Sequence, residues 1–114
     1  MTDEKLTIED LSPAGNGQRI LRLTGPLVLN SFFDFQTLIR EDQSSELVLD
    51  FTGVPYIDSA GIGALVGAYV NRQKDGRQLT LVGVSQRVRT ALQVTKVEHF
   101  FKFADSLPAK EAGA

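Results

Sequence analysis

The chain has 114 residues, of which 42% are hydrophobic and 23% charged, as is usual for one globular domain with its own core. A net charge of −2 and a pI near 5.3 argue against a nucleic-acid binder, because such proteins usually carry a basic stripe. Without cysteine, with one histidine and without a signal peptide or membrane-length apolar run, we expect a cytoplasmic protein that has no disulfide, no metal and no membrane insertion.

Two short strands open the chain and predict a hairpin. The first contains Leu6, Ile8 and Leu11 in weak alternation, and the second covers residues 18–24. The segment between them, residues 12–17, is rich in turn-forming residues. Strands joined by so short a loop should be antiparallel neighbours.

A first helix is predicted from Ser31 to about Arg40. Ser31 and Asp34 have the spacing of a capping box, with Asp in place of the usual Glu. Hydrophobic residues recur at helical spacing and mark the buried face: Phe32, Phe35, Leu38 and Ile39. This pattern assigns Phe33 to neither face.

The central stretch, residues 47–74, predicts a buried strand, a turn and a helix. Residues 47–51 are apolar except for Asp50, which is typical of a strand covered on both faces in a parallel sheet. After a break at residues 52–55, the helix begins near Asp58 and Ser59, both good N-cap types. Its buried face is marked by Ile62, Leu65, Val66, Tyr69 and Val70.

The last third predicts a strand near residues 79–82, a third helix capped by Ser85, and a short strand over residues 100–103. In that helix Val88, Ala91 and Leu92 point inward, and Arg87 and Arg89 outward. Strands alternating with helices predict an α/β fold in which right-handed crossovers form a mostly parallel sheet. We therefore expect one domain over residues 1–114, with about five strands, an antiparallel N-terminal hairpin and about three helices. Its ordered core should cover residues 5–106, with a loose tail over 107–114.

Ser59 is a candidate modification site because it lies at the N-terminus of a predicted helix. A helix N-terminus favours negative charge and can hold a phosphate, whereas the neighbouring Asp58 carboxylate would repel one. This combination permits an electrostatic switch. In the simpler interpretation Ser59 or Asp58 only caps the helix, a contribution of about 1 kcal/mol. Asp50 either shapes the charge around Ser59 or accepts backbone N–H groups at the end of its strand.

Three glycines, Gly61, Gly63 and Gly67, weaken the same helix by about 1 kcal/mol each relative to alanine. They indicate either close packing of the helix on the sheet or a low surface that a partner protein can approach. In the second case the docking surface is formed by Ser59, Ala60, Gly61, Ile62 and Gly63.

Catalytic motifs are incomplete, so we expect a protein that is not an enzyme and needs no cofactor. Gly61-Ile62-Gly63 would open a dinucleotide fingerprint, but the third glycine is replaced by Val66. A nucleophile elbow around Ser59 would require glycine where the chain has Ile57. His99 would complete a triad with Ser59 and Asp58 only by accident of folding.

Residues 49–65, LDFTGVPYIDSAGIGAL, resemble a STAS domain of the anti-sigma factor antagonist type. In that family a strand ending LDL-x-G-V is followed by DSSG or DSAG and a helix of small residues. The resemblance continues at residues 23–25 (LTG), 81–84 (LVGV) and 88–103.

The resemblance implies a bacterial regulator of transcription that works by partner switching, with Ser59 as the phosphoacceptor of a phosphoprotein. An anti-sigma factor with serine-kinase activity would bind it and transfer phosphate from ATP to Ser59, and a serine phosphatase would reverse the step. The unmodified protein would hold the anti-sigma factor and so release a sigma factor. The alternative is a non-switched STAS assembly subunit, of the scaffold or transporter-associated kind, in which Ser59 is only a helix cap.

The sequence departs from the family at three places. Val28 stands where members often have an acid near the phosphosite, which bears on the rate or occurrence of phosphorylation. Lys96 stands where a glycine is common after the third helix, and the usual C-terminal helix is short or absent.

Overall fold

A computed structural model describes residues 5–12 and 17–107. Its five strands are β1 Thr7–Asp10, β2 Gln18–Thr24, β3 Glu46–Gly53, β4 Gln78–Val82 and β5 Lys102–Ala104. Its helices are α1 Phe32–Glu41, α2 Ser59–Lys74 and α3 Gln86–Val94, with a short 3-10 helix, η1, at Glu98–Phe100. The predicted last strand begins later than expected because η1 occupies its first residue.

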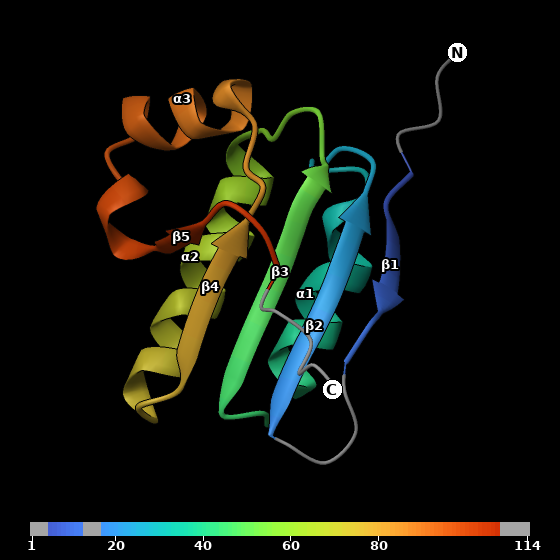
Figure 1. Cartoon of the computed structure of the whole chain (residues 1–114). Helices are drawn as coiled ribbons and strands as arrows, with labels where there is room; N and C mark the ends of the chain where they lie inside the picture. Colours follow the sequence, from blue (N-terminus) through green and yellow to red (C-terminus); the bar gives the residue numbers. More distant parts are fainter. Residues whose placement is uncertain (1–4, 13–16, 108–114) are drawn as a thin grey trace.

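The strands form one sheet in sequence order, β1-β2-β3-β4-β5 (Figure 1). Strand β1 runs antiparallel to β2, with Ile8 opposite Leu23. The remaining neighbours are parallel, and Leu49 of β3 lies between Leu21 of β2 and Leu81 of β4. The predicted α/β class, the mostly parallel sheet and the N-terminal hairpin are confirmed.

Helices cover one face of the sheet. Parallel strands that follow each other in sequence order, joined by right-handed crossovers, place their helices on the same side. Figure 1 shows α1 and α2 behind the sheet and α3 beyond the carboxyl end of β4. The core between sheet and helices is built from residues that alternate along the strands or recur along the helices, among them Leu21, Leu47, Leu49, Phe51, Phe35, Leu65, Leu81 and Leu92.

The opposite face of the sheet carries a smaller apolar cluster of Ile20, Val48 and Val82. Leu11 and Leu107 pack against this cluster from outside the sheet. Leu107, expected as the start of a loose tail, is therefore part of the packed structure. The rest of the predicted tail, residues 108–114, and residues 13–16 of the predicted turn lie outside the described residues.

The start of α1 differs from the predicted capping box. Ser31 precedes the helix, but its side chain makes no capping hydrogen bond. Its hydroxyl instead donates to the Pro26 carbonyl oxygen at 2.7 Å and accepts the Val28 N–H at 3.1 Å. The capping box is wrong because this hydroxyl is engaged by the loop that precedes the helix.

The end of α3 shows why the family commonly has glycine at the position of Lys96. Lys96 has a φ of 64°, the left-handed conformation that glycine adopts most readily. Its N–H donates to the Gln93 carbonyl oxygen at 3.0 Å, which closes the helix. The start of α3 follows the prediction, since the Ser85 side chain accepts the Val88 N–H at 3.2 Å.

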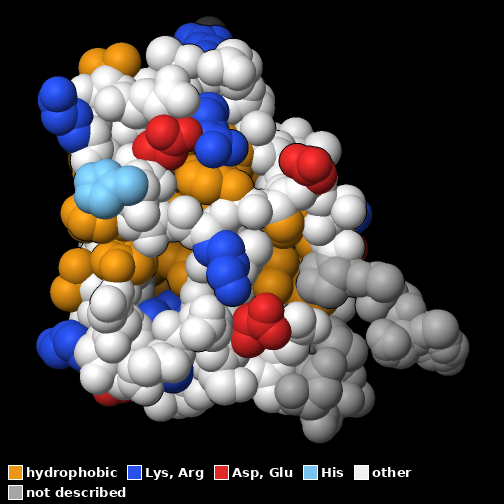
Figure 2. Space-filling view, turned by 60° about the vertical axis from the view of Figure 1, so that its left-hand side comes forward, with side chains coloured by type: hydrophobic (Ala, Val, Ile, Leu, Met, Phe, Trp, Pro, Cys, Tyr) orange, Lys and Arg blue, Asp and Glu red, His pale blue; other side chains and the backbone are white. Residues whose placement is uncertain are grey.

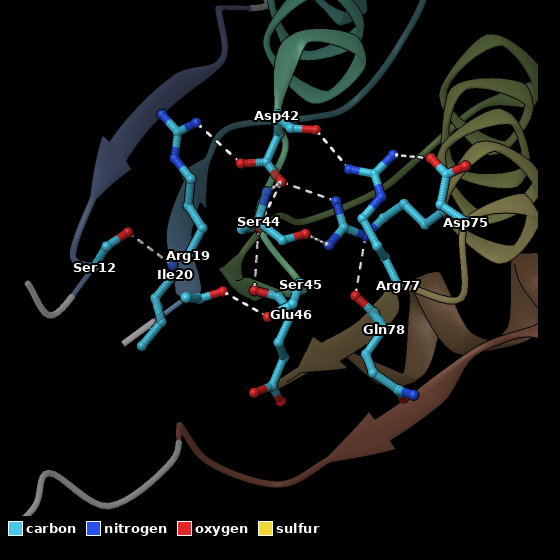
Figure 3. Close-up of polar contacts among 12 residues, drawn as sticks. Ser12, Arg19, Ile20, Asp42, Ser44, Ser45, Glu46, Asp75, Arg77 and Gln78 are labelled. Atoms are coloured by element: carbon cyan, nitrogen blue, oxygen red, sulfur yellow. Dashed lines mark hydrogen bonds and ion pairs between the residues drawn. The ribbon is translucent and has the colours of Figure 1, made fainter. Parts of the chain in front are cut away.

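A buried ion-pair cluster joins the amino ends of β3 and β4 to the carboxyl ends of α1 and α2 (Figure 3). Asp42 and Arg72 are 3% and 2% exposed, and Arg72 Nη1 donates to Asp42 Oδ2 at 2.8 Å. The other guanidinium nitrogens of Arg72 donate to the carbonyl oxygens of Gln78 and Ser44. Arg19 also donates to Asp42, at 3.2 Å. Each buried charge therefore has partners, as burial requires.

Burial alone would raise the pKa of Asp42. Hydrogen bonds from Ser44, Arg19 and Arg72 outweigh that effect and hold the pKa of Asp42 below its ordinary value. The carboxylate is therefore charged in the folded protein near neutral pH.

Candidate functional site

Ser59 is the first residue of α2 and is exposed at the carboxyl end of the sheet. Within residues 5–12 and 17–107, its hydroxyl makes no hydrogen bond. The N-cap is Asp58, whose Oδ1 accepts the Gly61 N–H at 3.0 Å. Of the two residues expected as the cap, Asp58 caps the helix and Ser59 does not. The Ser59 hydroxyl is left free for chemistry with a second molecule.

The approach to α2 is held by the segment that follows β2. Asp58 Oδ2 accepts the Leu29 N–H at 3.1 Å, so one carboxylate joins this segment to the helix. The Leu27 N–H donates to the Tyr56 carbonyl oxygen at 3.2 Å, and Leu27 forms an isolated parallel bridge with Ile57. These contacts fix the position of Ser59 relative to the sheet.

The three glycines of α2 have different surroundings. A Cβ atom on Gly61 would lie 2.1 Å from the Leu27 carbonyl oxygen, so this position has no room for a side chain. Gly63 and Gly67 are exposed, and a Cβ atom there would meet nothing within 4 Å. Gly61 therefore serves internal packing, whereas the fold does not require glycine at the other two positions.

The predicted docking surface is only partly accessible. Gly61 and Ile62 are buried beneath the segment after β2 and in the core, so they cannot contact a partner directly. Ser59 and Gly63 are exposed and Ala60 is half-buried. The accessible part of this surface is thus formed by Ser59, Ala60 and Gly63.

Asp50 does not belong to this site. Its neighbours Leu49 and Phe51 point into the core beneath the helices, so Asp50 points to the helix-free face. There Oδ1 accepts the Thr52 N–H at 2.9 Å, and Oδ2 accepts from Arg22 at 3.1 Å. The expectation that Asp50 shapes the charge around Ser59 is corrected, and its interpretation as an acceptor of backbone N–H is confirmed.

The same contacts set the charge of Asp50. Burial raises its pKa, but hydrogen bonds from Thr52 and Arg22 outweigh that effect and leave the pKa below the ordinary value. Asp50 therefore stabilises the face of the sheet opposite the helices.

Val28 occupies the position at which family members often have an acidic residue, and the structure buries it among apolar side chains. Val28 is 4% exposed and belongs to the core. Two hydrophobic residues that follow are open to solvent, with Leu29 at 65% and Phe33 at 68% exposure, whereas Phe32 between them is half-buried. Leu29 adjoins Asp58 through its N–H, so an apolar side chain flanks the Ser59 end of α2. The helical pattern did not identify this exposed pair.

A cation from α3 also reaches this end of the sheet. The Arg87 guanidinium lies over the Tyr56 ring, with Cζ 4.9 Å from the ring centroid. Sequence reasoning placed Arg87 only on the outer side of α3. His99 instead packs on Phe100, with ring centroids 4.4 Å apart. Among the described residues no contact joins His99 to Ser59 or Asp58, so these residues do not form a triad.

Other kinds of site find little support. Within residues 5–12 and 17–107, no group of three or more potential metal ligands occurs. In that same part of the chain, no helix has the length and apolar character needed to cross a bilayer. Figure 2 shows the face of the molecule around the single histidine, where basic and acidic side chains are interspersed rather than gathered in one field.

Two shallow hollows, of about 260 and 280 Å³, lie near the carboxyl end of α2 and share Arg72 and Arg77. Neither hollow is lined by Ser59 or by its neighbours in the 54–63 segment. They are therefore separate from the site at the start of α2.

Comparison with protein families gives a match to the STAS domain over residues 11–109. The anti-sigma-B factor antagonist of Staphylococcus aureus (strain NCTC 8325 / PS 47) is 29% identical over 59 residues. That match covers 52% of this chain and 55% of the relative, so the chain spans about half the length of the curated relatives it matches.

Solved structures share the fold at low identity. An anti-sigma factor antagonist from Mycobacterium paratuberculosis superposes with a TM-score of 0.79 at 17% identity, covering 93% of this chain and 91% of that one. The structure of SLC26A9 gives a TM-score of 0.71 at 20% identity, covering 80% of this chain but 18% of the other. The phosphorylated form of the Bacillus cell fate determinant SpoIIAA gives 0.65 at 16%, covering 88% and 93%.

Proposed function

The chain belongs to the STAS domain family, and we propose that it is an anti-sigma factor antagonist that is switched by phosphorylation of Ser59. On this proposal it is a binding regulator rather than an enzyme, and it acts in the cytoplasm. Its partners are an anti-sigma factor with serine-kinase activity and a serine phosphatase. The name of the Staphylococcus aureus relative supports the class of partner.

The observation that carries the proposal is the free hydroxyl of Ser59 at the start of α2. Asp58 already caps the helix, so the exposed hydroxyl has no structural task among the described contacts. A kinase active site can therefore approach it without first breaking a capping bond. The segment from Asp58 to Gly61 also matches the family's phosphoacceptor pattern. One of the structural neighbours, SpoIIAA of Bacillus, has been solved in a phosphorylated form, which supports the same proposal.

The chemistry is phosphoryl transfer in the complex with the kinase. Ser59 Oγ attacks the γ-phosphorus of ATP, the bond from that phosphorus to the β-phosphate oxygen breaks, and ADP leaves. The hydroxyl proton passes to a base of the partner, because the Asp58 carboxylate is already engaged by two N–H groups. The phosphatase reverses the change by hydrolysis, which restores serine and releases inorganic phosphate.

The phosphate changes the charge of the proposed docking surface. A phosphoserine carries about −1.5 to −2 charges at pH 7 and adds to the negative charge of Asp58. It also projects above Ala60 and Gly63, where the surface is low. A partner fitted to the unmodified surface would therefore lose contact and meet repulsion. Val28 removes the acid usual in the family, so on this proposal the kinase must position Ser59 without it.

The test is affinity capture from the source cells with four forms of the full chain: wild type, Ser59→Ala, Ser59→Glu and Ser45→Glu. Ser45 is an exposed serine at the amino end of β3, so its substitution adds the same charge at the other end of the sheet. We expect wild type, Ser59→Ala and Ser45→Glu to recover one protein with an ATP-binding kinase domain, and Ser59→Glu not to recover it. The purified partner should then transfer phosphate from ATP to wild type but not to Ser59→Ala.

Equal recovery of the same scaffold or membrane-transport proteins by all four forms would overturn this function. That result would instead support the alternative, a non-switched STAS assembly subunit. The fold shared with SLC26A9 is compatible with either outcome, since a fold alone does not determine function.

A further inference from the structure

The charged residues around Ser59 include one arginine without a carboxylate partner. Of the seven arginines in the sequence, five form ion pairs: Arg19, Arg22, Arg72, Arg77 and Arg89. Within residues 5–12 and 17–107, Arg40 and Arg87 form none. Arg40 lies in the last turn of α1, at the opposite end of the sheet, whereas Arg87 lies in the first turn of α3.

The ring beneath Arg87 belongs to the segment that leads into Ser59. Tyr56 precedes Ser59 by three positions, and the Leu27 N–H fixes its carbonyl oxygen. The contact between Arg87 and the ring therefore places the N-terminus of α3 over the segment that enters α2. Figure 1 shows α3 beyond the carboxyl end of β4, on the side of the sheet where α2 begins.

The present partner of Arg87 holds it weakly. A cation over an aromatic ring at an exposed site gains little stability from that contact, because water screens the attraction. A guanidinium binds a phosphate more strongly, because its planar N–H groups match two phosphate oxygens at once. Arg87 is exposed and has a long, flexible side chain, so its guanidinium is free to leave the ring for a stronger partner.

We propose that Arg87 is the residue that responds to the phosphate on Ser59: its guanidinium leaves the Tyr56 ring and pairs with the phosphate. This inference rests on the proposed phosphorylation of Ser59 and adds its regulation. Asp58 opposes the phosphate, and Arg87 offsets part of that repulsion from the other side. Phosphorylation then also uncovers the Tyr56 ring, so the surface seen by a partner changes in shape as well as in charge.

The test needs neither kinase nor partner. Phosphoserine is introduced at position 59 of the full chain during translation, and its second pKa is measured by ³¹P NMR titration. Free phosphoserine has a second pKa of about 6, and a nearby cation lowers it because the dianion is favoured. We expect this pKa to be about half a unit higher in Arg87→Gln than in wild type. Arg40→Gln, which removes the other unpaired arginine, should match wild type.

A second measurement tests whether the Arg87 guanidinium leaves the Tyr56 ring on phosphorylation. The NMR signals of the Tyr56 ring should shift between the unmodified and phosphorylated wild type, and should not shift in Arg87→Gln. Circular dichroism verifies that each variant is folded. Lys5 lies beside Gly25, the residue that follows β2. Lys5 is therefore the alternative cation that could pair with the phosphate at this end of the sheet. Equal pKa values in wild type and Arg87→Gln, or a rise only in Lys5→Gln, would overturn the proposal.

The result of the phosphoserine titration can be distinguished from the result of the affinity capture that tests the proposed function. If no kinase partner exists, the affinity capture fails while the titration still gives its own answer. If the partner is captured but the pKa is unchanged by Arg87→Gln, phosphorylation switches binding without this arginine.

Discussion

The carboxylate of Asp58 accepts the N–H of Leu29 at 3.1 Å and the N–H of Gly61 at 3.0 Å. One side chain thus joins the segment after β2 to the first turn of the helix that carries Ser59. The position of the free hydroxyl is therefore set by the residue that precedes it.

We expect Asp58→Asn to separate these two bonds. The amide oxygen of asparagine still caps α2, but its NH₂ group faces the Leu29 N–H and cannot accept from it. The free energy of unfolding should fall by about 1 kcal/mol, and the Leu29 amide should exchange faster with solvent by hydrogen-exchange NMR. Asp58→Ala removes both bonds and should cost about 2 kcal/mol. Unchanged exchange at Leu29 in both variants would contradict the bridging role.

The glycines of α2 should respond in opposite directions to the same substitution. Gly61→Ala places a Cβ atom against the Leu27 carbonyl oxygen, and we expect a loss of about 1–3 kcal/mol of unfolding free energy. Gly63→Ala and Gly67→Ala meet open space and should each stabilise the helix by up to about 1 kcal/mol. Urea unfolding measures all three.

The exposed glycine nearest to Ser59 also tests the docking surface. If a partner approaches the helix closely there, Gly63→Ala should weaken capture of the partner although it stabilises the fold. Gly67→Ala, one turn further along the helix, is the matched control. Equal partner affinity in wild type and Gly63→Ala would argue against close approach at this position.

The buried pair of Asp42 and Arg72 should dominate stability at the amino end of the sheet. Asp42→Asn leaves the Arg72 charge buried without its counterion, and we expect a loss of about 3–5 kcal/mol of unfolding free energy. Asp75→Asn removes the partner of Arg77 at an exposed position and should cost less than about 1 kcal/mol. Similar losses in the two variants would contradict the argument from burial.

The two buried carboxylates, Asp42 and Asp50, determine the direction in which stability changes with pH. The pKa values of Asp42 and Asp50 are lower in the folded state than their ordinary values. The stability they contribute is therefore present above the unfolded pKa of about 3.9 and is lost as the pH falls through the lower folded values. Thermal unfolding should show a falling Tm below about pH 4, with a shallower fall in Asp42→Asn.

Lys96 offers a stabilising substitution at the place where the family often has glycine. Its backbone is left-handed, which costs a residue with a side chain about 1 kcal/mol relative to glycine. Lys96→Gly should therefore raise the free energy of unfolding by up to about that amount. Lys74→Gly, within the last turn of α2, should lower it by about 1 kcal/mol. A loss in both variants would show that the Lys96 side chain contributes more than its backbone costs.

Apolar periodicity was sufficient to predict the order of strands and helices, because each element buries one face or stripe against a neighbour. The same periodicity also predicts the direction of the Asp50 side chain, because alternation along β3 places Asp50 on the face opposite Leu49 and Phe51. Proximity in the sequence to Ser59 was the wrong guide there.

Polar contacts could not be predicted in the same way. The spacing of Ser31 and Asp34 predicted a capping box, but the Ser31 hydroxyl is engaged by Pro26 and Val28. The Arg72–Asp42 pair and the contact of Arg87 with Tyr56 join residues on different elements, so no local pattern reveals them. A sequence shows that such side chains are polar, while the tertiary arrangement decides which of them meet.

The sheet follows the order of the chain, and this has a consequence for how the protein folds. Every parallel pair joins strands separated by a single crossover, so each strand pairs with a strand that is adjacent to it in the sequence. The loops that must close are therefore about as short as parallel pairing allows, which limits the entropy lost on closing each of them. During synthesis, each new strand can add to the edge left by the one before it, so the sheet can grow from β2 toward β5 as the chain emerges.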